Sequence, residues 1–241
     1  MIKLYGSLSP NVQKIIIALA ELGLDHEFIS INVHRGDNFS PEILKLNPLG
    51  KIPILIDTNG PGQEPITIFE SGAILIYLSE TYGGLLPVDR RARTQVIQWL
   101  MFQMSSVGPM WGQFNHFVRY AAEDVYGVER FTTTARKIYD QIDERLGVSP
   151  YLGGDEYSIA DVATFPWVRV ESKLFGDKYP AMRMNWEGHP NIARWCAEIE
   201  RRPAVQKALI QIDALPSNRG TGSAEEEDRL TGRGAFALTL N

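Results

Sequence analysis

Every stretch with the pattern of a β-strand lies in the first part of this chain. Short apolar or alternating runs occur at residues 2–5, 27–33, 51–57 and 65–69, and strand patterns stop there. From residue 93 to about residue 213 the apolar residues recur at helical spacing instead. This division predicts a small α/β region followed by an all-helical region.

Helical patterns separate the predicted strands. Ser9 as an N-cap and Pro10 at a first helical position begin the first helix, a short helix begins at Pro41, and a longer one begins near Glu70. The resulting order is β-α-β-α-β-β-α. A strand, a helix and a strand within about thirty residues indicate a parallel crossover, and the third and fourth strands indicate a hairpin.

The composition excludes several classes of protein. The chain has 241 residues and a formal net charge of −5, which argues against a surface built to bind nucleic acid. Its single cysteine, Cys196, cannot form an intramolecular disulfide, which is typical of a reducing compartment. No signal peptide and no run of eighteen apolar residues are visible, so we expect a cytoplasmic protein that does not enter a membrane.

Composition and pattern together divide the chain into four segments. We expect an α/β domain at 1–82, a linker at 83–92 and an all-helical domain at 93–214. From residue 215 onward glycine, serine and charged residues dominate, and such a mixture buries little apolar surface. We therefore expect 215–241 to be a mobile tail.

Three stretches carry a family resemblance: NPLGKIPIL at 47–55, FESGAILIYL at 69–78 and YLGGDEYSIADVATFPW at 151–167. In order and spacing the chain resembles the glutathione transferase superfamily. This implies a thioredoxin-like N-terminal domain that binds glutathione and a helical-bundle C-terminal domain. The stretches SPNVQKI, WLMFQMSSVGPMWGQFNHF and GVERF are similar to the bacterial Nu class and to the related fungal nitrogen-regulator group.

Ser9 has two interpretations. As a plain N-cap it stabilises the helix by about 1 kcal/mol. The positive end of a helix also favours a thiolate, and a hydroxyl or amide donor stabilises that anion further. The resemblance places the glutathione sulfur near Ser9 and Asn11, where many Nu-class proteins carry Thr-Pro-Asn-Gly. Both roles of Ser9 are compatible, and either side chain could donate to the sulfur.

The resemblance also implies how the rest of glutathione is bound. It implies a cis peptide bond between Ile52 and Pro53, with the Ile52 backbone paired to the cysteinyl unit; an ordinary edge-strand proline is the alternative. Glu70 and Ser71 match the pair that binds the γ-glutamyl group, although acids and serines are common at helix starts.

Charged and aromatic residues complete the expected site. The resemblance implies that Lys51 binds the glycyl carboxylate, and Asn38, which matches a glutamine in many Nu-class sequences, could reach the same carboxylate. It also implies that Arg130 contacts glutathione from the helical domain. Alternatively, Lys51 and Arg130 are ordinary surface charges. The rings of Trp111, Phe114 and Phe117 follow a bend expected at Gly108-Pro109. The default interpretation of these rings is a core stripe, whereas the resemblance makes some of them the second-substrate pocket.

Two further features indicate structure rather than chemistry. Ser158 and Asp161 form a capping-box pattern, which stabilises a helix start. The histidines show no metal-ligand spacing with one another or with Cys196, so we expect no metal.

With no C-x-x-C pair, the reactive sulfur must come from glutathione. The resemblance implies a homodimeric glutathione-dependent disulfide reductase acting on small-molecule disulfides. One alternative is a lyase or transferase acting on aromatic electrophiles or aryl ethers. The other is a non-catalytic regulatory protein that binds glutathione; the fungal regulator works through an N-terminal extension, whereas this sequence begins at its first strand, which favours an enzyme.

Overall fold

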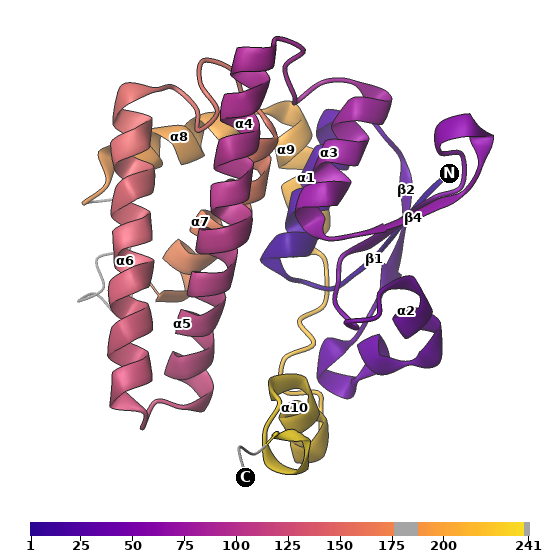
Figure 1. Ribbon diagram of the computed structural model, residues 1–241, viewed down its shortest axis with the longest axis vertical. Helices are drawn as coiled ribbons and strands as arrows, with labels where there is room; N and C mark the ends of the chain where they lie inside the picture. The colour runs from indigo at the N-terminus through magenta and orange to yellow at the C-terminus, as the bar shows by residue number, and fades with distance from the viewer. Residues whose placement is uncertain (176–187, 239–241) are drawn as a thin grey trace. The chain divides into compact units, whose positions relative to one another are not determined.

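A computed structural model describes residues 1–175 and 188–238. The chain forms two compact units (Figure 1). Unit 1 comprises Met1–Ile74 together with the chain from Lys207 onward, and unit 2 comprises Leu75–Gln206. Among the described helices, none combines the length and the apolar character that a membrane span requires.

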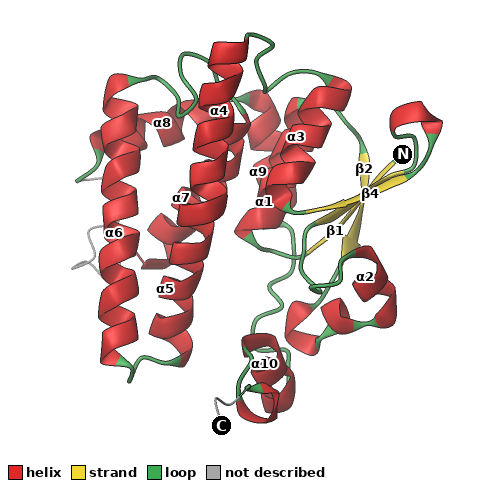
Figure 2. Cartoon of the chain, viewed as in Figure 1, coloured by secondary structure: helices red, strands yellow, loops and turns green. Residues whose placement is uncertain are grey.

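Unit 1 is built on one mixed four-stranded sheet (Figure 2). Its strands are β1 (Ile2–Gly6), β2 (His26–Ser30), β3 (Ile54–Asp57) and β4 (Ile66–Phe69), in the order β2-β1-β3-β4. β1 and β2 pair in parallel, whereas β3 is antiparallel to both β1 and β4. The predicted parallel crossover, the hairpin and the thioredoxin-like order are confirmed.

The helices within residues 1–74 of unit 1 begin where the sequence predicts. They are α1 (Pro10–Glu21), α2 (Pro41–Leu46) and the first turn of α3 (Ser71–Tyr82), and two short 3₁₀ turns, η1 (Val33–Arg35) and η2 (Asp37–Phe39), precede α2. A further 3₁₀ turn, η3 (Pro61–Gln63), connects β3 to β4. α1 and α2 lie on opposite sides of the sheet (Figure 1). Under α2, Ile43 packs with Ile31 and Ile54 in an apolar cluster.

Unit 2 is helical wherever regular structure is described. Its elements are the rest of α3, α4 (Arg90–Phe102), the π-helical segment η4 (Gln103–Val107), α5 (Gly108–Tyr120), α6 (Val125–Val148), α7 (Ile159–Phe175), α8 (Pro190–Glu200) and the start of α9 (Pro203–Asp213). Their inward faces are apolar, as the helical spacing predicts. The expected helical-bundle domain is therefore confirmed.

The bend expected at Gly108-Pro109 takes the form of a π-helical turn. Residues 103–107 widen the helix immediately before Pro109, and Gly108 itself keeps helical torsion angles. Proline has no N–H to donate and its ring crowds the carbonyl four residues earlier. A wider turn accommodates both effects, so the helical path continues from α4 into α5.

The Ser158–Asp161 pattern is a buried structural network. Asp161 is fully buried and accepts hydrogen bonds from Ser158 N and Oγ, both at 3.0 Å. Its other oxygen accepts from Leu152 N and from Trp195 Nε1, both at 2.9 Å. The start of α7 is thereby bonded to the preceding loop and to α8, which confirms a role in stability.

The C-terminal segment differs from the expected mobile tail. It contains a helix, α10 (Ala224–Thr231), and a 3₁₀ turn, η6 (Gly234–Phe236). Ser223 and Glu226 form a complete capping box at the start of α10, and Gly232 ends the helix in the left-handed region. α10 packs against η1, so residues far away in the sequence contribute to holding it in place.

Candidate functional site

The register of the sheet gathers the predicted site segments at one end of unit 1. Tyr5 lies opposite Ile54, and Ile54 lies opposite Phe69. The segments that leave these positions are therefore neighbours: the loop after β1, the loop before β3 and the connection from β4 to α3. Because Gly6 pairs with Ser30, the segment after β2 begins at the same end.

Ser9 lies at the first of these positions and caps α1. Its backbone is extended, and its hydroxyl oxygen accepts from Val12 N at 3.4 Å. The N-cap interpretation is therefore confirmed. A serine hydroxyl has one donor besides its acceptor sites, and the cap uses only an acceptor. Ser9 can consequently cap the helix and donate to an anion at the same time. Asn11 is half-buried in the first helical turn.

The second segment places Lys51 at the surface on a braced loop. Asn38 is buried, and its amide nitrogen donates to Gly50 O at 2.8 Å. Asn47 Nδ2 donates to Lys51 O at 2.8 Å. Gly50 has a φ of +60°, and a Cβ added there would lie 2.8 Å from Asn38 O, so the turn requires glycine. Asn38 thus positions the Lys51 segment, whereas its direct contact with a ligand stays a prediction.

The Ile52–Pro53 peptide bond is cis, as the resemblance implies. Pro53 is buried and immediately precedes β3 rather than lying inside the strand. Ile52 is half-buried and packs against the apolar cluster under α2. Its backbone therefore borders the end of the sheet where the other segments meet.

Glu70 and Ser71 form the third position, at the start of α3. Glu70 has a φ of +70°, which is unfavourable for a residue with a side chain and is found preferentially at functional sites. The Glu70 side chain is exposed and Ser71 is buried. A carboxylate at the surface beside a buried hydroxyl is suited to the ammonium and the carboxylate of an amino-acid group.

Lys14 is a member of the site that the sequence analysis missed. It lies on α1, is fully buried, and its Nζ donates to Ser71 Oγ at 3.2 Å. Burial lowers the pKa of Lys14 well below its ordinary value, and the charge of Glu70 opposes that shift. The run IIIALA after Lys14 leaves this part of α1 without a polar face, and that signal could have indicated a buried lysine.

Unit 2 carries the remaining predicted residues. Arg130 is exposed on α6. Trp111 and Phe114 are fully buried, and Trp111 Nε1 donates to Ala135 O at 3.2 Å. Phe117 is half-buried and stacks on Phe131, with ring centroids 5.1 Å apart. Trp111 and Phe114 are therefore core residues of this unit, and of the three predicted rings Phe117 keeps exposed surface.

The only cysteine is unsuited to act as a nucleophile. Cys196 is fully buried on α8. Burial raises the pKa of the Cys196 thiol well above its ordinary value, and the nearby charge of Glu200 raises it further. A thiol held in this form does not react as a thiolate.

Two family models match the chain. Residues 8–81 match the glutathione S-transferase N-terminal domain, and residues 117–203 match the glutathione S-transferase C-terminal domain. The first match contains every predicted site segment of unit 1, and the second contains Arg130 and Cys196.

Individual proteins match over most of their length. The disulfide-bond oxidoreductase YfcG of Escherichia coli K12 is 38% identical over 213 residues, which cover 88% of this chain and 95% of that protein. A glutathione transferase family member from Pseudomonas fluorescens Pf-5, solved with two glutathione bound, has a TM-score of 0.80 and 39% identity, covering 86% of this chain and 92% of that one. A glutathione transferase from Pseudomonas putida, solved with one glutathione disulfide per subunit, has a TM-score of 0.76 and 37% identity, covering 86% and 90%.

Proposed function

The chain belongs to the glutathione S-transferase family, and we propose that it is a glutathione-dependent disulfide oxidoreductase of the Nu class. YfcG, which is named a disulfide-bond oxidoreductase, supports the reaction type. The two Pseudomonas structures, one with two glutathione bound and one with glutathione disulfide, support a site that accepts both redox forms.

The observation that carries the proposal is the sheet register. Tyr5, Ile54 and Phe69 are neighbours across three strands, so the Ser9 cap, the Ile52 backbone and the Glu70–Ser71 pair border one end of the sheet. These groups are complementary to a thiolate, to a peptide unit and to an amino-acid head group, respectively. Glutathione carries all three features: the cysteinyl thiol, the peptide backbone of the cysteinyl unit and the amino-acid group of the γ-glutamyl unit.

The glutathione would be held along that end of the sheet. Glu70 accepts from the γ-glutamyl ammonium, and Ser71 donates to the α-carboxylate. The Ile52 backbone pairs with the cysteinyl unit as a short strand does. Lys51 binds the glycyl carboxylate, and Ser9 or Asn11 donates to the sulfur at the positive end of α1. The role of Arg130 in binding stays a prediction.

The reaction needs no thiol from the protein. One glutathione thiolate attacks a sulfur of the substrate disulfide and expels the other sulfur as a thiolate, which takes up a proton. A second glutathione thiolate attacks the mixed disulfide and expels the remaining thiolate. The products are glutathione disulfide and two thiols, and the two electrons come from the two glutathiones.

The test is a titration with glutathione combined with turnover of bis(2-hydroxyethyl) disulfide. We expect saturable binding of glutathione and steady disulfide reduction. Cys196→Ala should retain turnover, because the buried thiol takes no part. Binding without turnover of this disulfide, of a peroxide or of an aryl ether would instead indicate a regulatory protein. Turnover of the aryl ether alone would indicate the lyase or transferase alternative.

We also propose a homodimer in the cytoplasm. The family resemblance supports the dimer, and the lone buried cysteine suits a reducing compartment. Sedimentation of the full chain at micromolar concentration should give twice the chain mass. A single-chain mass under those conditions would contradict the dimer.

A further inference from the structure

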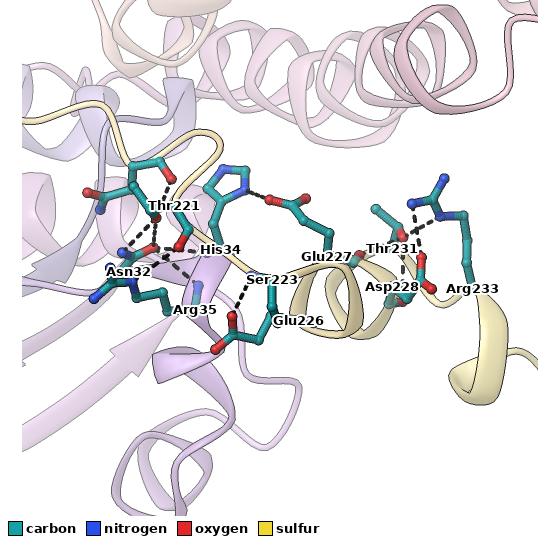
Figure 3. A network of polar contacts seen from close by, with 11 residues as sticks. Asn32, His34, Arg35, Thr221, Ser223, Glu226, Glu227, Asp228, Thr231 and Arg233 are labelled. Atoms are coloured by element: carbon teal, nitrogen blue, oxygen red, sulfur yellow. Dashed lines mark hydrogen bonds and ion pairs between the residues drawn. The ribbon is translucent and has the colours of Figure 1, made fainter.

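The C-terminal segment lies beyond residue 203, where the match to the C-terminal family model ends, yet part of it is folded onto unit 1. Figure 3 shows that its polar contacts with unit 1 reach Asn32, His34 and Arg35, which follow β2. Asn32 Nδ2 donates to Thr221 Oγ1 at 3.1 Å, and that hydroxyl donates to Asn218 O at 2.7 Å. Arg35 Nε donates to Thr221 O at 3.3 Å.

The segment approaches η1 so closely that one position must be glycine. A Cβ added at Gly222 would lie 1.9 Å from His34 O, a backbone atom that cannot move independently. Any side chain at this position would therefore separate the two backbones. Such close backbone contact indicates specific docking rather than a loose association.

Helix α10 then holds side chains on both 3₁₀ turns. Glu227 Oε1 lies 2.6 Å from His34 Nδ1, and both side chains are largely shielded from solvent, with 19% and 16% exposed (Figure 3). The Arg229 guanidinium lies 4.6 Å from the centre of the Phe39 ring, within range of a cation–π interaction. α10 is therefore bonded at η1 and again at η2.

The segment 32–39 contacts the Lys51 loop. The position where Gly50 would carry a Cβ lies 3.1 Å from the Phe39 ring and 2.8 Å from Asn38 O. Asn38 also donates to Gly50 O. A continuous set of contacts thus runs from Glu227 and Arg229 through the segment 32–39 to Gly50, next to Lys51.

We infer that α10 is a positioning element that fixes the Lys51 loop for the glycyl end of glutathione. The inference rests on the proposed function, which assigns the glycyl carboxylate to Lys51. Without α10, the segment 32–39 loses the support of Glu227 and Arg229, and fixing it together with the Lys51 loop on ligand binding costs affinity. The effect is confined to ligands that carry the glycyl unit.

The experiment compares full-length variants by calorimetric titration with two probes, glutathione and γ-glutamylcysteine, which lacks the glycyl unit. Glu227→Ala and Gly222→Ala should weaken glutathione binding on the order of tenfold while changing γ-glutamylcysteine binding less than about twofold. Glu227→Gln keeps an acceptor for His34 and should restore most of the affinity. Glu225→Ala, an exposed glutamate on the same helix, is the matched control and should behave as wild type.

Unchanged glutathione affinity in both Glu227→Ala and Gly222→Ala would overturn the inference. An equal loss for both probes would also overturn it, since α10 would then support the fold in general. If the wild-type chain binds neither probe, the proposed function fails on its own, and hydrogen exchange of the ligand-free protein decides on α10. Faster exchange at residues 32–52 in the two variants, with α1 unchanged, upholds the positioning role, and unchanged exchange there rejects it.

Discussion

Lys14 Nζ lies 3.2 Å from Ser71 Oγ, and both side chains are buried. The lysine donates in this contact and so occupies an acceptor site of the serine oxygen. The hydroxyl hydrogen of Ser71 points away from Lys14, and in the proposed complex Ser71 would donate it to a carboxylate. The pair thus suits Ser71 to the α-carboxylate of the proposed γ-glutamyl group.

Ser71→Ala should weaken glutathione binding by roughly 1.5–3 kcal/mol, because the bound carboxylate loses a charge-assisted hydrogen bond. The measurement is the Michaelis constant for glutathione. Ser79→Ala is the matched control, since Ser79 is a buried serine further along α3. A Michaelis constant that stays at the wild-type value in Ser71→Ala would remove Ser71 from the site.

The difference in the free energy of unfolding between wild type and Lys14→Met should depend on pH. The pKa of Lys14 is depressed in the folded protein. Its contribution to the free energy of unfolding is therefore fully present above the unfolded pKa of about 10.5, and it is lost as pH falls through the folded pKa. The free energy of unfolding of wild type minus that of Lys14→Met should therefore rise between neutral pH and pH 10.5. Urea unfolding at several pH values measures it.

The control for this series is Lys45→Met, because Lys45 is an exposed lysine on α2. Its difference from wild type should stay nearly constant over the same pH range. A constant difference for Lys14→Met as well would show that Lys14 is not shifted in the folded protein.

Local sequence signals are sufficient for the architecture of residues 1–74. Proline and serine at helix starts, alternating apolar residues in strands and the turn-rich segment before β4 act over a few residues, and the structure follows them. The cis bond before Pro53 came from the family resemblance and not from a local rule. Ser9 combines both sources: a local signal predicts its cap, and the family resemblance implies a role for its hydroxyl.

The features that were missed depend on distant partners. Lys14 is buried because α1 is covered along Val12–Leu19, and its partner Ser71 is 57 residues away. α10 has a local signal, the capping box of Ser223 and Glu226, but its composition is polar. What holds it in place is the pairing of Glu227 with His34, 193 residues apart, which a local pattern cannot indicate.

Asp161→Asn should lower the free energy of unfolding by roughly 1–3 kcal/mol, because an amide nitrogen would replace an oxygen that accepts buried hydrogen bonds. The carboxylate accepts from the Ser158, Leu152 and Trp195 donors, and an asparagine can satisfy only some of them. Denaturant unfolding measures the change. Asp155→Asn, at an exposed position in the preceding loop, is the control and should be nearly neutral. A neutral Asp161→Asn would mean that the network rearranges around the amide.

The final prediction separates the two roles of Ser9. Aspartate caps a helix as well as serine does, so Ser9→Asp should leave the melting temperature almost unchanged. If the hydroxyl donates to the glutathione thiolate, the aspartate places a second negative charge beside the sulfur and raises the thiol pKa. Turnover at neutral pH should then fall and the pH optimum should move upward. Ser9→Thr keeps a hydroxyl and should keep activity.

The measurement is a pH–rate profile of wild type, Ser9→Asp, Ser9→Thr and Asn11→Ala, with thermal melts of the same proteins. We expect the Ser9→Asp profile to shift while its melt does not, because the cap accepts from Val12 N in either case. A Ser9→Asp profile that coincides with wild type would show that the Ser9 hydroxyl acts only as the N-cap of α1. A loss of turnover in Asn11→Ala would then identify the asparagine as the donor to the thiolate, and normal turnover there would leave the backbone N–H groups at the start of α1 as the donors.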